Sequence, residues 1–148
     1  MHKVPKTMRY TFIFYASLLL SCSSEKPDLR VIESEFAERT KLFHELYITA
    51  GDCSERNAMI DKDIIFLENG QPFTYENILE YCSYIKPKDV FNIYSKQYLI
   101  QPTVGFDYVD QYYLNSEQDT LRETASRIWQ LKSDNWLVTH MQVSRQIN

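Results

Sequence analysis

TLRETASRIWQLKSDNWLVTHMQVSRQ, residues 120–146, decides the fold of this chain. Apolar and polar residues alternate on both sides of the polar stretch 132–135, which predicts two long strands, 120–131 and 136–146, joined by a short turn. The same period of two precedes them at 90–100 and 104–114. Successive long strands with short links predict an antiparallel meander.

The part of the chain before these strands has the period of a helix. Apolar residues recur at steps of three, four or seven from Leu29 to Ala50, so we expect a helix there, capped by Asp28 and ended by Gly51. Shorter helices are expected at 54–59 and 74–85, with a strand at 63–67 and an Asn-Gly turn at 69–70 between them. Helices followed by such a sheet predict an α+β domain in which the sheet curls around the helices.

The two closing strands carry a recognisable pattern. Ser126-Arg127-Ile128-Trp129 is followed by a polar turn and then by Trp136-Leu137-Val138-Thr139-His140, which runs on to Ser144. This pattern resembles the closing hairpin of the nuclear-transport-factor-2-like superfamily, and it is closest to the SnoaL-like branch. Ala50-Gly51-Asp52, leading into the strand and turn at 63–70, is similar to the same family's upstream elements.

The resemblance implies a fold for residues 28–148. It is a cone in which three N-terminal helices pack in a strongly curved antiparallel sheet, with a cavity at the open end. Members of the superfamily include ketosteroid isomerase, scytalone dehydratase and polyketide cyclases, together with many noncatalytic binding and assembly domains. Shared fold does not confer shared chemistry. Many members dimerise through the outer sheet face, so the resemblance also implies a homodimer.

Residues 1–21 have the layout of an export signal that ends before Cys22. His2, Lys3, Lys6 and Arg9 precede the apolar segment 10–20, and small Ser21 comes before Cys22. An apolar segment of this length is too short for a transmembrane helix, which needs about 20 residues. We therefore expect a lipoprotein signal peptide at 1–21, lipidation of Cys22 and a tether at 22–27, although an ordinary secretory signal with an incidental cysteine is the alternative.

This segment predicts localisation in the cell envelope, with the lipid on Cys22 as the membrane attachment. Two or more acyl chains give stable anchoring. Ser23 follows the cysteine in place of the aspartate that resembles an inner-membrane retention signal, which favours the outer membrane.

The charge of the mature chain argues against a polyanionic partner. Residues 1–21 hold three of the 16 Lys and Arg residues and none of the 20 Asp and Glu residues, so 13 basic residues remain against 20 acidic ones. Nucleic-acid binding needs clustered basic residues, and here they are scattered among acids. We expect no nucleic-acid partner.

Neither a cofactor nor a metal is expected. The chain has three glycines and no Gly-rich phosphate loop, and no Ser/His/Asp order is present. Cys53 and Cys82 lack the paired spacing of a zinc site. In an oxidising compartment they can form a disulfide, while a buried free Cys82 on a helix face is the other interpretation.

Two residues are candidates for a catalytic base. Asp110 lies on one face of its predicted strand among aromatic residues, and if that face lines the cone, loss of water contact would raise the carboxyl pKa. His140 alternates with Trp136 and Val138 on the last strand. The competing interpretations are that Asp110 is wetted or paired with a basic residue such as Arg127, and that His140 is structural.

Several large side chains are candidates for the wall of a cavity. Tyrosine offers apolar area with a polar tip, so a Tyr-rich sheet face either lines a pocket or forms a flat outer surface for a partner. The predicted pocket-lining residues are His44, Tyr47, Phe106, Tyr108, Tyr112, Trp129 and Trp136.

The preferred function is that of a noncatalytic envelope lipoprotein whose cone binds a small apolar ligand or a protein partner. The alternative is an isomerase, dehydratase or cyclase-like enzyme that uses Asp110 or His140 as general base. A purely structural role is favoured if side chains fill the cone.

Overall fold

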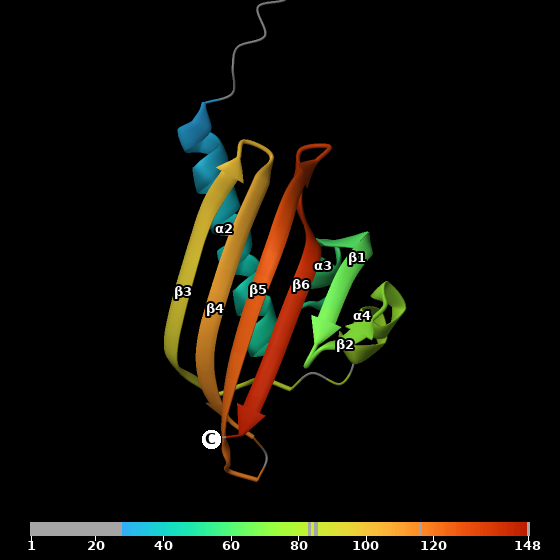
Figure 1. The fold of residues 1–148 in the computed structure, drawn as a ribbon, viewed down its shortest axis with the longest axis vertical. Coiled ribbons are helices and arrows are strands. Elements are labelled where there is room, and N and C mark those ends of the chain that lie inside the picture. Colours follow the sequence, from blue (N-terminus) through green and yellow to red (C-terminus); the bar gives the residue numbers. More distant parts are fainter. Residues whose placement is uncertain (1–27, 83, 85, 116, 148) are drawn as a thin grey trace, which may run out of the picture.

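The computed structural model describes residues 28–82, 84, 86–115 and 117–147. The predicted signal peptide, Cys22 and the tether lie outside these residues. The described residues form three helices and one six-stranded sheet (Figure 1). The helices are α2 (Leu29–Thr49), α3 (Cys53–Asn57) and α4 (Tyr75–Cys82), and the strands are β1 (Ile60–Glu68), β2 (Gln71–Phe73), β3 (Val90–Gln101), β4 (Val104–Leu114), β5 (Thr120–Lys132) and β6 (Asn135–Ile147).

Helix α2 begins and ends as the sequence predicts. The Asp28 carboxylate accepts a hydrogen bond from the Arg30 backbone N–H at 2.9 Å, which caps the first turn. After Thr49, Ala50 takes a left-handed conformation with φ 52°, and the Gly51 N–H donates to the Leu46 carbonyl. The helix buries one face against the sheet, with Ile32, Phe36, Thr40 and Phe43 as its buried residues.

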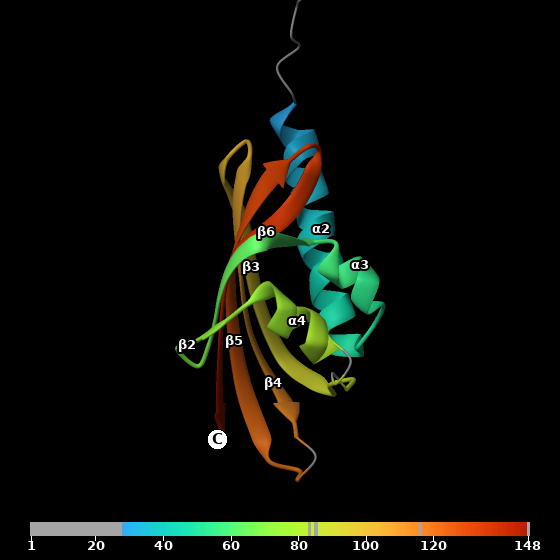
Figure 2. The same cartoon turned by 90° about the vertical axis from the view of Figure 1, so that its right-hand side faces the viewer.

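The strands form one sheet in the order β2-β1-β6-β5-β4-β3. Strands β3 to β6 make the predicted antiparallel meander, and the α+β class and the curved sheet around helices are confirmed. One pairing departs from the expected antiparallel arrangement, because β1 runs parallel to β6. Figure 2 shows that the sheet bends and that all of the described helices lie on its concave side.

The hydrophobic core lies between α2 and the middle of the sheet. Trp129 is 0% exposed, and its ring meets Phe43 edge-on with centroids 5.4 Å apart. Phe36 packs on Trp136 at a centroid distance of 4.8 Å. Gly105 of β4 lies directly under Phe36, so a Cβ atom at this position would overlap the ring. The helix can approach the sheet this closely because Gly105 has no side chain.

The side chains of β4 alternate between two faces of the sheet. The odd-numbered residues from Gly105 to Tyr113 are buried and face the helices, whereas the even-numbered residues from Phe106 to Tyr112 are half-buried on the outer face. This alternation places most of the predicted pocket residues of β4 on the wrong side of the sheet.

A β-bulge changes the alternation along β6. Trp129 pairs with Val138 and Ile128 pairs with His140, so Thr139 is an extra residue between them. Before the bulge Trp136 and Val138 face the core, and after it Met141, Val143 and Arg145 line the inner side.

No described helix is both long and apolar enough to cross a membrane.

Candidate functional site

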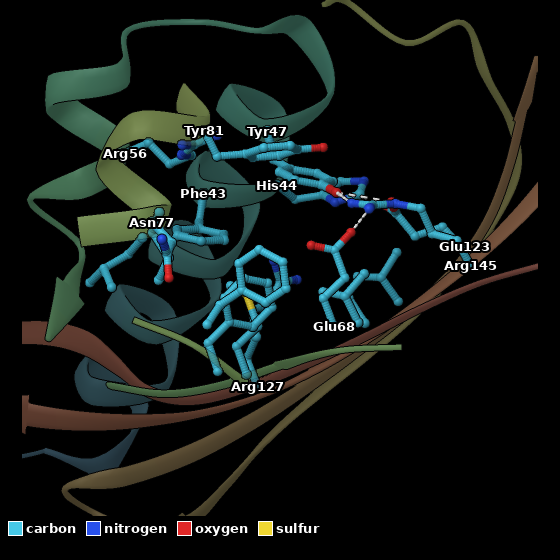
Figure 3. Close-up of a pocket in the computed structure, with 18 of the residues that line it drawn as sticks. Phe43, His44, Tyr47, Arg56, Glu68, Asn77, Tyr81, Glu123, Arg127 and Arg145 are labelled. Atoms are coloured by element: carbon cyan, nitrogen blue, oxygen red, sulfur yellow. Dashed lines mark hydrogen bonds and ion pairs between the residues drawn. The ribbon is translucent and has the colours of Figure 1, made fainter. Parts of the chain in front are cut away.

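A cavity lies between the described helices and the concave face of the sheet (Figure 3). It offers about 40 Å³ to the centres of water-sized molecules. One water needs about 10–15 Å³ on such a measure. The cavity therefore holds a few waters or a small chemical group without movement of the walls.

One side of the cavity is apolar. Its residues come from α2, from α4 and from the inner faces of β1, β2, β4, β5 and β6: Phe43, Ile60, Phe66, Phe73, Ile78, Val109, Ala125, Met141 and Val143. At the mouth, Asn77 is exposed and Tyr81 is 40% exposed, so α4 forms the rim that water reaches.

The other end of the cavity is polar and is organised by Glu123, which is 1% exposed. Its carboxylate accepts hydrogen bonds from Tyr47 Oη at 2.9 Å, Lys88 Nζ at 2.9 Å, Gln111 Nε2 at 2.8 Å and Arg145 Nε at 2.6 Å. A buried carboxylate is stable only when it is paired in this way. Glu123 is thus a structural anion with satisfied oxygens.

The polar cluster also fixes the state of Tyr47. Arg145 forms a further ion pair with Glu68 and donates through Nη2 to Tyr47 Oη at 2.8 Å. Burial, and then the negative charge of Glu123, raise the pKa of the Tyr47 hydroxyl well above its ordinary value. Tyr47 is therefore a neutral hydroxyl on the cavity wall.

A second buried ion pair lies across β4 and β5. Asp107 and Arg127 are each 3% exposed, and Arg127 Nε lies 3.0 Å from both oxygens of Asp107. The Trp129 indole N–H donates to the same carboxylate at 2.5 Å. The pair joins neighbouring strands inside the core and places the Arg127 side chain at the cavity wall.

Within the part of the chain that the structure describes, two buried polar atoms on the cavity wall have no hydrogen-bond partner. They are His44 Nε2 and Gln111 Oε1. Burial, and then the positive charge of Arg127, lower the pKa of the His44 imidazole to about 4. His44 is therefore neutral near neutral pH. Buried polar groups in folded proteins are nearly always satisfied, so each of these atoms calls for a partner.

Arg56 is the other unusual group in the cavity wall. It is 4% exposed, and within the described chain its side-chain contact is a 3.5 Å approach of Nη2 to Asn57 Oδ1. No described carboxylate forms an ion pair with it, and burial lowers the pKa of its guanidinium. In Figure 3, Arg56 lies beside Tyr81, at the opposite end of the cavity from Glu123 and Arg145.

The disulfide joins the two short helices that carry Arg56 and the rim residues. Cys53 opens α3 and Cys82 ends α4, and the bridge between them has a Cα–Cα distance of 5.8 Å. The sequence left open whether the two cysteines are bridged or free, and in the structure they form a disulfide. This bridge holds one wall of the cavity in place.

The predicted placement of Asp110 in the cone is wrong. Asp110 lies on the outer face of β4 and pairs with Arg122, with Nη2 and Oδ2 2.6 Å apart. Hydrogen bonds from Arg122 lower the pKa of the Asp110 carboxyl, which is the reverse of the shift expected inside a cone. The basic partner foreseen for this carboxylate was Arg127, but Arg127 faces inward and pairs with Asp107.

His140 also lies outside the cavity. Because the bulge at Thr139 reverses the alternation, the exposed His140 side chain points away from the helices while Trp136 and Val138 point toward them. His140 lines a shallow depression on the outer face with Phe106 and Ile128. The general base proposed from the sequence is therefore absent from the cavity at both candidate positions.

The predicted aromatic wall is only partly present. His44 and Tyr47 do line the cavity. Phe106, Tyr108 and Tyr112 lie on the outer face of β4, because the odd-numbered residues of this strand face the helices. Trp129 and Trp136 fill the core beside α2 and do not reach the cavity.

Sequence reasoning found His44 and Tyr47 but missed the other groups of the polar part of the site. Gln111 and Glu123 lie on the inner face of the sheet with Val109 and Ala125. The sequence alone does not show which set of alternating residues in β4 and β5 faces inward. Arg56 lies in a five-residue helix, which is too short to show a period. In the described part of the chain, no group of His, Cys, Asp and Glu side chains is arranged to hold a metal.

Comparison with known proteins gives matches among solved structures. An NTF2-like protein of unknown function in nutrient uptake from Rhodospirillum rubrum has 18% identity and a TM-score of 0.55, over 73% of this chain and 95% of that one. An NTF-2 like protein of unknown function from Shewanella oneidensis has 12% identity and a TM-score of 0.59, over 75% and 97%. The association domain of C. elegans CaMKII has 15% identity and a TM-score of 0.60, over 75% and 93%.

At these identities the similarity concerns the fold alone. No family model matches the sequence, and no curated protein matches it. The helices on the concave side of a bent sheet, the order of elements and these structural matches agree with one another. The described domain has the nuclear-transport-factor-2-like fold.

Proposed function

We propose that this protein is a noncatalytic, lipid-anchored component of the cell envelope whose SnoaL-like domain binds a small molecule in the cavity. The observation that carries the proposal is a pair of buried atoms on the cavity wall, His44 Nε2 and Gln111 Oε1, that have no hydrogen-bond partner among the described residues. Leaving such atoms unsatisfied costs about 1–3 kcal/mol each. A bound molecule that reaches them recovers this cost.

The composition of the wall supports a ligand with an apolar body and a polar group. Convergent polar atoms in a largely apolar concave site are typical of small-molecule sites. Phe43, Phe66 and Phe73 offer the apolar surface, and the exposed rim on α4 gives a route of entry. Apolar surface, polar atoms and a route of entry therefore occur together on one concave surface.

The absence of both sequence-proposed bases from the cavity supports binding over catalysis. An isomerase or dehydratase needs a base beside the bound ligand. Asp110 and His140 lie on the outer face, and the lowered pKa of His44 makes its imidazole a weak base. An enzyme would have to use a cavity group other than Asp110 or His140 as its base.

The test of binding uses protein extracted from the envelope and measured by native mass spectrometry. Wild type is expected to retain a small molecule. Ala125→Met fills the cavity and is expected to lose it, whereas Ser126→Met, on the next residue of β5 and on the outer face, is the matched control and is expected to retain it. A wild-type protein without adduct, or an adduct that survives Ala125→Met, contradicts the proposal.

The same spectra test the anchor at Cys22. The proposal rests on the basic start, the short apolar segment and the small residue before the cysteine. It predicts a mature chain that begins at Cys22 and carries acyl chains, in the outer-membrane fraction. A mature chain that begins at Ser23 or Ser24 without lipid would contradict it.

The homodimer stays a prediction of the family resemblance. Its support is the edge strand β3, along which large apolar side chains are exposed: Phe91, Ile93, Tyr94, Tyr98 and Ile100. Native mass spectrometry reads the mass of a pair directly, and a monomer at all accessible concentrations would contradict the dimer.

A further inference from the structure

We infer that the ligand of the cavity is a small organic acid whose carboxylate binds the Arg56 guanidinium. This inference rests on the proposed binding function and names the chemical class of its ligand. Arg56 is buried at the cavity wall and has no carboxylate partner in the described chain.

The pairing of the other charges isolates Arg56. Among the described residues that line the cavity, each other charged side chain has an opposite partner: Glu68 pairs with Arg145, Glu123 with Arg145 and Lys88, and Arg127 with Asp107. His44 adds no positive charge near neutral pH, since its pKa is about 4. Arg56 therefore leaves the cavity with one positive charge in excess.

An unpaired buried guanidinium is unfavourable for folding. Removing a charge from water costs free energy that only an opposite charge and hydrogen bonds recover. Elsewhere in the described chain, cation–π contacts stabilise buried cations: Arg127 packs on the Phe43 ring, and Lys88 on Tyr47 and Tyr113. Among the described residues, no such contact is formed by Arg56. A position selected for stability alone would carry an apolar residue here, so the arginine points to a bound anion.

The surroundings favour a carboxylate over a phosphate. A guanidinium presents parallel N–H donors that match one carboxylate. One unpaired cation balances a monoanion, whereas phosphate sites usually combine several cations or a glycine-rich loop of backbone N–H groups. The apolar residues Phe73 and Ile78, which line the same cavity, suit the carbon skeleton of the acid.

The local framework holds Arg56 in place. The Asp52 carboxylate caps α3 by accepting from Ser54 N at 2.8 Å, and Cys53 ties the same helix to Cys82 of α4. Preorganised side chains bind ligands more tightly because less freedom is lost on binding. The five-residue helix is thus fixed at its start by a cap and a covalent bond.

The test compares acids with their uncharged amides on the full, detergent-extracted protein. The probes are acetate, butyrate and benzoate against acetamide, butyramide and benzamide, with inorganic phosphate as a competing class of anion. Binding is measured by calorimetry and by thermal unfolding followed through tryptophan fluorescence. Wild type is expected to bind at least one acid more tightly than its amide by about tenfold or more, the effect of one charged hydrogen-bonded contact. The best acid is also expected to raise the Tm.

Three variants locate the effect. Arg56→Met is expected to lose the preference for acids and, in the absence of ligand, to raise the Tm because a buried unpaired charge is gone. Arg56→Lys is expected to retain part of the preference. Arg122→Gln removes a positive charge from the outer face and is expected to behave as wild type.

Each contrary outcome has its own meaning. Equal binding of acids and amides that survives Arg56→Met but is lost in Ala125→Met overturns the acid assignment and leaves the binding function standing. Binding that survives Ala125→Met overturns both. Tighter binding of inorganic phosphate than of every acid in the panel, or a lower Tm for Arg56→Met, also overturns the carboxylate assignment.

Discussion

Cys53 and Cys82 join the helix that carries Arg56 to the helix that carries Ile78 and Tyr81. The two cysteines are 29 positions apart in the sequence, and residues of both helices line one cavity. The disulfide consequently acts on stability and on the site together.

Removing this bridge should lower the free energy of unfolding by about 3–4 kcal/mol, because the unfolded chain regains the freedom of the open loop. The measurement is urea unfolding of wild type and of the double variant Cys53→Ser with Cys82→Ser. A reductant should bring wild type to the level of the double variant and leave the double variant unchanged. Equal stability of the oxidised and reduced wild type would sink this prediction.

The pair Asp107 and Arg127 should be far more important for stability than Asp110 and Arg122. Both pairs join β4 to β5, but the first is buried and the second lies on the outer face, with Arg122 40% exposed at its side chain. Asp107→Asn leaves a buried guanidinium without a counter-ion and should cost about 3–5 kcal/mol. Asp110→Asn, the matched control, should cost less than about 1 kcal/mol.

Urea midpoints of the two variants check this difference. A similar, small effect of both substitutions would mean that the Asp107 carboxylate is reached by water and is not the buried partner of Arg127 and Trp129.

Acidification should destabilise the protein in the range where His44 titrates. The ordinary pKa of histidine is 6.5, and in the folded protein burial and Arg127 lower the His44 pKa to about 4. Between these values the unfolded chain binds a proton that the folded chain refuses, so stability falls as the pH drops from 6.5 toward 4. His44→Asn should flatten this dependence, whereas His140→Asn, on the outer face, should not.

Unfolding midpoints measured from about pH 6.5 to pH 4.5 test this expectation. A wild-type stability that is constant across this interval, or a slope that remains in His44→Asn, would show that protonation of His44 does not cause the pH dependence of stability.

Gly105→Ala should destabilise the core by about 1–3 kcal/mol, because the added methyl group overlaps the Phe36 ring and forces α2 or the ring to shift. Phe36→Leu makes room at the same place. Gly105→Ala should therefore cost less in the Phe36→Leu background than in wild type, a coupling that a double-mutant cycle measures. Additive effects would contradict the close contact.

Much of the fold could be predicted from local sequence patterns. The strand Val104–Leu114 has the predicted bounds, and α2 begins after its predicted cap. The remaining differences have physical causes. The three-residue strand β2 is too short to show a period, and the parallel pairing of β1 with β6 joins segments far apart in the chain.

The site was less predictable because local sequence does not determine which face of the sheet points toward the helices. Strand β4 carries one Asp and at least one aromatic residue on each face, so alternation alone does not say whether Asp107 or Asp110 is buried. The bulge at Thr139 moves His140 to the other face without any glycine to mark it. His44 and Tyr47 were found because a long helix shows which of its faces is apolar.

The most direct measurement is an experimental structure of the protein extracted from the envelope and crystallised with the acid that binds most tightly. We predict density in the cavity with the carboxylate against Arg56 and the carbon skeleton against Phe73 and Ile78. A cavity closed by its own side chains, or an acid bound only on the outer sheet face, would contradict the binding of an organic acid at Arg56.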